Sequence, residues 1–208
     1  MLNAHLPGRR LAAVAVAAVA GSAAFGVADA GATDPNATDN TNAGCRYIAR
    51  PARSIPASLR RAAMMCALNR ARKANSVAAL RLSLPLSRAA STHATRSVAL
   101  KWWDRGNPLV SHVNPQTGTV ALQRDVAAKY CLGGQPTVSE LTYSGGGGTA
   151  GSPSAAANFW LNDPAQRLAL LHTPGLDAGP GIAPGSAYNP ADPEPAGTYV
   201  VDLGRCTR

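Results

Sequence analysis

Four cysteines constrain the fold of this chain more than any other feature of its sequence. They lie far apart, and no two of them form the close C-x-x-C pair of a zinc site: Cys45, Cys66, Cys131 and Cys206. An even number of widely spaced cysteines predicts two disulfides, which three connectivities could satisfy. We favour Cys45 with Cys66 and Cys131 with Cys206, which would tie an N-terminal arm to the first helix and the end of the chain to its middle.

Residues 1–30 have the layout of a secretory signal peptide. Arg9 and Arg10 precede an Ala-rich apolar run over 11–27, and Ala28 and Ala30 form an A-x-A cleavage pattern. The run is weaker than the ~20 strongly apolar residues of a membrane span, although an uncleaved anchor is the alternative. We therefore expect a signal peptide over 1–30, a flexible polar arm over 31–44 and a secreted, extracellular domain over 45–208 without a transmembrane segment. Disulfides agree with that compartment.

The charge distribution suggests an anionic partner. The formal net charge is +9, and thirteen Lys or Arg residues lie between Arg46 and Arg105 against one acid, Asp104. A cell-envelope polymer or a lipid head group would fit such a block, and a solvated basic face is the alternative. A nucleic-acid partner is disfavoured, because the basic residues lack interleaved aromatic side chains and no base-reading module is present.

The order of the elements predicts an α+β fold. Ser54-Ile55-Pro56 opens a helix that runs to about Lys73, and Pro85 opens a second one from Leu86 to about Trp103, with an extended link between the two. Shorter helices are expected over 120–130, 154–162 and 164–171, and strands over 139–144, 179–183 and 197–204. Helices packed on a small antiparallel sheet are the architecture that this order favours.

Seven segments between Cys66 and Arg205 follow a recognisable order: CALNRARK, LPLSRAASTHA, SHVNPQTG, SELTYSG, NFWLNDPAQRLALL, GPGIA and TYVVDLGR. This order resembles the bacterial branch of the CAP superfamily, the cysteine-rich secretory, antigen 5 and pathogenesis-related 1 proteins with an SCP-like domain. That family has an L-N-x-x-R helix, an S-H-x-x-P-x-G turn, a G-E-N-I strand, a W-x-x-S-P-G-H-R segment, a G-x-G strand and a closing D-F-G. The resemblance implies a three-layer α-β-α sandwich with a small central antiparallel sheet.

The resemblance also implies a cleft in which two histidines and one or two acidic residues face each other, around a divalent metal in some members. His112 matches the histidine of S-H-x-x-P-x-G, and Glu140 matches the acid of G-E-N-I. Gln166 stands where the second histidine is expected, and Ser139 and Leu141 replace the neighbours of the acid. His112, Glu140 and Gln166 are therefore the candidate residues of a degenerate cleft, and an ordinary buried carboxylate is the alternative interpretation of Glu140.

The replacement by Gln166 disfavours a metal cofactor. A zinc site needs at least three protein ligands, and a carboxamide oxygen binds Zn²⁺ far less well than an imidazole. His172 follows Gln166 by six residues, which on a continuous helix turns it about 240° away. We expect no cofactor, with zinc completed by Asp163 or His172 as the alternative.

Two classes of function follow. The leading hypothesis is a secreted, non-catalytic binding protein of the extracellular space or cell envelope, whose ligand would meet the cleft residues. The alternative is a secreted hydrolase or peptidase that uses His112 and Glu140, with or without a metal. No G-x-S-x-G elbow is present, and Ser111, if extended, would point away from His112. The sequence thus leans against an enzyme.

Four further residues of these segments have structural interpretations. We expect His93 to be partly buried and hydrogen-bonded, and Trp160 to belong to the core. Arg167 is expected to pair with a carboxylate, and Pro180 to interrupt a strand.

Overall fold

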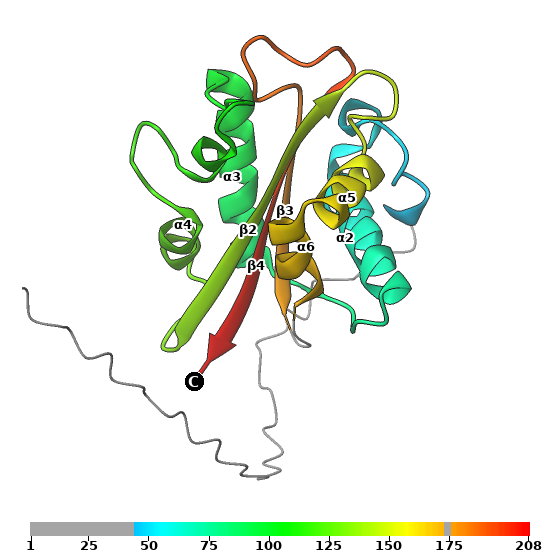
Figure 1. Cartoon of the computed structure of the whole chain (residues 1–208). Coiled ribbons are helices and arrows are strands. Elements are labelled where there is room, and N and C mark those ends of the chain that lie inside the picture. Colours follow the sequence, from blue (N-terminus) through cyan, green and yellow to red (C-terminus); the bar gives the residue numbers. More distant parts are fainter. Residues whose placement is uncertain (1–43, 173–175) are drawn as a thin grey trace, which may run out of the picture. The chain divides into compact units, whose positions relative to one another are not determined.

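The computed structural model describes residues 44–172 and 176–208 (Figure 1). The expected signal peptide and all of the expected arm except Gly44 lie outside these residues. Within the described part of the chain, no helix combines the length and apolar character needed to cross a membrane.

A four-stranded sheet forms the middle layer of the domain. Its strands, in the order β1-β3-β4-β2, are β1 (Arg81–Leu82), β3 (Asp177–Pro184), β4 (Ala196–Thr207) and β2 (Gln135–Gly146). Strands β3, β4 and β2 are antiparallel, as expected, whereas β1 runs parallel to β3. The sheet is therefore mixed, and the expected extended link before the second helix contains its short edge strand.

Helices cover both faces of this sheet (Figure 1). On one face lie α2 (Ala57–Ala74), α5 (Pro153–Asn162) and α6 (Pro164–Leu171), and on the other lie α3 (Leu84–Leu100) and α4 (Ala121–Ala127). Two short 3-10 helices, η1 (Ala52–Ser54) and η2 (Pro108–His112), precede α2 and α4. Each face has its own apolar core, the larger one around Trp160 and the smaller one around Trp103. The predicted α-β-α sandwich is confirmed.

The helices begin where capping residues and prolines predict them. Ser83, Ser152 and Asp163 each accept a hydrogen bond from a backbone N–H of the first turn, and each of these helices has a proline at its start. The second helix ends at Leu100 rather than near Trp103, because Lys101 adopts a left-handed conformation with φ of 51° and turns the chain.

Pro180 does not interrupt its strand, contrary to expectation. It lies inside β3, opposite Val201 of β4. Strand β1 pairs only with Asp177 and Ala178, so beyond Ala178 the other side of β3 is an open edge. A residue without an N–H is tolerated at such an edge because no neighbouring strand needs that donor.

Both favoured disulfides are present. Cys45 bonds to Cys66 in α2, and Cys131, just after α4, bonds to Cys206 near the end of β4. The second disulfide closes the longer loop, with a sequence separation of 75 residues against 21.

The L-N-x-x-R segment of α2 has a structural role. Asn69 accepts a hydrogen bond from the backbone N–H of Leu80 and donates one to its carbonyl, which holds the segment that leads into β1. The fully buried Arg72 donates to the carbonyl oxygens of Leu170 and His172 at the end of α6. Both side chains thus join α2 to later parts of the fold.

The basic block of the sequence is divided between the two faces of the sheet. Its α2 members lie on one face, and Arg88 and Arg96 of α3 lie on the other. Three more of its arginines are paired with acids from the second half of the chain, through Arg53–Glu194, Arg81–Asp177 and Arg105–Asp192. The block therefore does not form one continuous basic face.

Candidate functional site

The turn η2, which contains His112, is held by two side chains from the preceding segment. His93, on α3, donates from Nε2 to the carbonyl of Ser111 at 2.7 Å, since only a protonated nitrogen can bond a carbonyl. Trp102 donates from Nε1 to the carbonyl of Val110 at 3.1 Å, and its ring packs edge-on against His93. The expected hydrogen bond of His93 is confirmed. Its ring is wholly buried, and burial lowers its pKa.

Ser111 lies in this 3-10 turn rather than in an extended segment, which corrects the sequence-based expectation. Its hydroxyl contacts the Pro108 carbonyl at 2.6 Å and the Thr142 hydroxyl at 2.8 Å, and the residue is buried. This hydroxyl therefore joins the turn to β2, and it makes no hydrogen bond with His112 that could activate it as a nucleophile.

His112 and Glu140 meet at the end of this turn. Their Nδ1 and Oε2 atoms are 2.8 Å apart, and the side chains are 33% and 3% exposed. Since a carboxylate can only accept, Nδ1 carries the proton, and the exposed edge of the ring presents Nε2. The structure thus brings together two of the three candidate residues.

Arg124 of α4 bonds to both members of this pair. It was not identified from the sequence. Its guanidinium forms an ion pair with Oε1 of Glu140 and donates to the carbonyl oxygens of His112 and Thr119. No feature of the short RDV segment indicates that its arginine reaches a strand sixteen residues later in the chain. Both oxygens of Glu140 are therefore engaged: Oε1 by the charge of Arg124 and Oε2 by the hydrogen bond from His112.

The surroundings of Glu140 keep it ionised. Burial alone would raise its pKa, but the hydrogen bond from His112 and the positive charge of Arg124 outweigh burial and hold the pKa of Glu140 below its ordinary value. A carboxylate so paired is a poor general base, because a base must be free to take a proton near the operating pH.

Two further carboxyl groups lie behind this cluster. Asp202 is opposite Glu140 in the β2–β4 register, and Asp125 follows Arg124 on α4. Both are fully buried; their carboxyl groups share a hydrogen bond with each other, and no other group among residues 44–172 and 176–208 bonds to them. Burial, with the negative charge of Glu140 nearby, raises the pKa of Asp125 to about 7 and that of Asp202 well above its ordinary value. At least one of the two acids is therefore protonated at neutral pH.

Gln166 has a structural role. Its Oε1 accepts from the backbone N–H of Thr142 on the outer strand β2 at 3.2 Å, while its own N–H bonds to the capping carboxylate of Asp163. Gln166 and the Ser111 turn thus approach the same residue of β2 from different sides. No hydrogen bond joins Gln166 to His112 or Glu140 in the described structure.

The residues that the structure describes do not fit the metal that the resemblance implies. Glu140 is bonded to Arg124 and His112, the Gln166 oxygen is bonded to Thr142, and Asp163 caps α6. His172 borders a hollow with Ser139 and Leu203, on the α6 face of the sheet, whereas Glu140 points to the α4 face. Within the two described ranges, no three His, Cys, Asp or Glu side chains gather as a metal site would require.

Two further residues of the motif segments, Trp160 and Arg167, have structural contacts. Trp160 is fully buried, as expected, and donates to the Thr142 carbonyl at 2.9 Å. Arg167 instead bonds to the amide oxygen of Asn75 and to the Leu161 carbonyl, so the expected carboxylate partner was wrong.

Comparison with known proteins gives similarity of shape alone. No protein-family model and no curated protein matches the chain. An outer surface protein from Borrelia burgdorferi is similar over 67% of this chain and 87% of its own, with 20% identity and a TM-score of 0.49. An extracellular protein containing an SCP domain, from Bacillus anthracis str. Ames, is similar over 70% of this chain, with 18% identity and a TM-score of 0.48; the chain spans 40% of it.

Proposed function

We propose that this chain is a secreted, CAP-like binding protein in which the His112–Glu140 pair shapes a recognition surface and performs no catalysis. The observation that carries this proposal is the double pairing of Glu140. Both of its oxygens are engaged inside the protein, by Arg124 and His112, and the side chain is 3% exposed, so a metal or a substrate has little access to the carboxylate. The exposed edge of His112 is the part of the pair that a ligand can reach.

Secretion is part of the proposal. The sequence of residues 1–30 supports it, and so do the two disulfides, which persist in oxidising compartments. Fractionation of producing cells would test it: the protein should be found outside the cytoplasmic membrane with residues 1–30 removed. A full-length chain retained inside the cell would contradict it.

Titration calorimetry with Zn²⁺ tests the binding function against a metal site. The oxidised protein should show no tight one-to-one zinc binding, and His112→Ala should change nothing in the titration. An exposed-histidine control, His172→Ala, should behave in the same way. Tight binding that is lost in His112→Ala and retained in His172→Ala would overturn the proposal.

The alternative is a hydrolase or peptidase that uses His112 as a base oriented by Glu140. The observation that favours it is the 2.8 Å hydrogen bond, which would hold the ring with Nε2 outward, as a general base requires. A panel of peptide and glycan substrates separates the two functions. Turnover that disappears in Glu140→Gln, in a variant that still folds, would establish the enzyme and reject the binding protein.

A further inference from the structure

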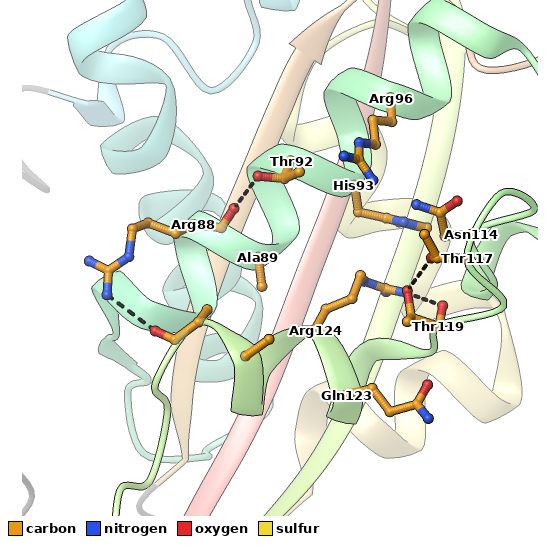
Figure 2. A pocket seen from close by; sticks show the side chains of 12 residues that line it. Arg88, Ala89, Thr92, His93, Arg96, Asn114, Thr117, Thr119, Gln123 and Arg124 are labelled. Carbon is orange, nitrogen blue, oxygen red and sulfur yellow. Dashed lines mark hydrogen bonds between the residues drawn. The ribbon is translucent and has the colours of Figure 1, made fainter.

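A second pocket lies between α3 and α4, on the face of the sheet that carries Glu140 (Figure 2). Its volume is about 410 Å³, within the range of small-molecule sites. Neither His112 nor Glu140 lines it, so an argument about this pocket does not depend on the function proposed above.

Three arginines and no acidic residue line this pocket. Arg88 and Arg96 come from one face of α3, and Arg124 comes from α4 (Figure 2). Arg124 is neutralised by Glu140, but Arg88 and Arg96 have no ion pair with any residue of the described ranges. Arg88 donates one hydrogen bond, to the Ala128 carbonyl, and keeps its charge. Both side chains are exposed, and the pocket therefore carries two positive charges that no acid of the described residues compensates.

The wall opposite α3 adds neutral hydrogen-bonding groups. Asn114 is only 2% exposed, and its Oδ1 is fixed by the backbone N–H of Gln116 at 2.9 Å. That bond determines which way the amide is turned, and its nitrogen makes no hydrogen bond within the described part of the chain. Figure 2 shows this nitrogen on the side of Asn114 that faces α3. Thr117 and Thr119 line the same wall.

His93 supplies a buried group that is unused on the same side of α3. It lines the pocket, it is 1% exposed, and its Nδ1 is buried with no partner among the described residues. Figure 2 shows the ring extending from α3 toward Asn114. Because Nε2 carries the ring proton, Nδ1 can only accept a hydrogen bond, so it is suited to a ligand hydroxyl, such as that of a monoprotonated phosphate.

We propose that this pocket binds an oxyanion of the phosphate type, held by Arg96 and the amide of Asn114, with Arg88 adding positive charge from the other end of the pocket. Guanidinium groups bind phosphate oxygens through paired N–H donors, and a donor amide adds direction without an opposing charge. The volume accommodates a phosphate ester as well as the free ion. The ester could belong to a soluble molecule or to a lipid head group, since the exposed Leu122 and Val126 lie on the same helix as Arg124.

Titration calorimetry with inorganic phosphate tests the site. The oxidised full chain, in low-salt buffer free of phosphate and sulfate, should bind with one-to-one stoichiometry. Arg96→Gln should weaken binding by about tenfold or more, because it removes a charged pair of donors, and Arg88→Gln should weaken binding less, through the loss of its charge alone. The matched control is Arg70→Gln, an exposed arginine of α2 on the other face of the sheet, which should bind as the parent does. Thermal unfolding of each variant verifies that it is folded.

A second arm identifies the source of the phosphate group. Sedimentation with vesicles of phosphatidylglycerol, compared with phosphatidylcholine, measures head-group binding. Binding of inorganic phosphate alone assigns a soluble ligand, and binding to the anionic vesicles that Arg96→Gln abolishes assigns a head group. Absence of both, or binding that Arg70→Gln weakens as much as Arg96→Gln does, would overturn the proposal.

Discussion

The two buried acids behind Glu140, Asp125 and Asp202, should make the free energy of unfolding depend on pH. Unfolded, Asp125 ionises near an ordinary pKa of about 4, whereas in the folded protein burial raises its pKa to about 7. Between these pH values the folded state holds a proton that the unfolded state has released. Stability from this group is therefore present at low pH, is lost as the pH rises through this window, and changes no further above about 7.

Replacing Asp125 by Asn should remove this loss. The variant should equal or exceed the parent in stability at pH 8, by on the order of a few kcal/mol, and the difference should shrink toward pH 5. Urea denaturation at pH 5, 6, 7 and 8 measures it. Asp104→Asn, at an exposed carboxylate, is the matched control for the same chemical change at the surface. A difference between Asp125→Asn and the parent that is constant from pH 5 to 8 would contradict the assignment.

The sequence predicted that His112 and Glu140 lie together, but it did not predict the charged residues around them. The resemblance placed His112 and Glu140 in one cleft, and the structure joins them by a hydrogen bond. Arg124 and the two buried aspartates were not foreseen, because a polar residue on a short helix gives no signal of the strand that it will face. Only the packing of α4 on the sheet determines that these charges meet.

Among the elements, helices were predicted better than strands, for a physical reason. Caps and prolines mark a helix start locally, as at Ser83 and Asp163. Strand β1 has only two residues and exists through its pairing with β3, and β2 extends well beyond the expected 139–144 because β4 provides a partner along its length. Pairing between distant segments leaves no local pattern, so strand limits and the mixed character of the sheet were missed.

The contact between α3 and β3 depends on a glycine. A Cβ at Gly181 would overlap the backbone of α3 at Ala90 and Ser91, so the strand and the helix approach each other more closely than side chains permit. We expect Gly181→Ala to destabilise the protein by about 1–3 kcal/mol, as other overpacked sites do.

Urea denaturation of Gly181→Ala beside Gly106→Ala checks this packing. At the exposed Gly106 a Cβ would meet only the side chain of Asp104 at ordinary contact distance, so this change should stay within about 0.5 kcal/mol. Equal stability of the two variants would show that α3 shifts away from the sheet at no cost.

For the whole molecule, the two disulfides should differ in what they contribute. On the chain-entropy model, the stabilisation grows with the logarithm of the loop length, and the separations of 75 and 21 residues differ more than threefold. Removing Cys131–Cys206 as a double Ala variant should therefore cost ~1 kcal/mol more than removing Cys45–Cys66 in the same way. Urea midpoints of the two variants measure this. The reverse order of stability would show that native packing around α2, rather than chain entropy, dominates.

The turn that presents His112 is fastened on three sides, by His93 and Trp102 from behind, by Thr142 through Ser111, and by Arg124 through the His112 carbonyl. Such a surface is preorganised. If a partner docks there, as the proposed binding function implies, it would freeze little of this protein, and selectivity would come from complementary shape rather than from adaptation. Substitutions in the partner should consequently be felt as steric misfit, with little rearrangement of the turn to relieve them.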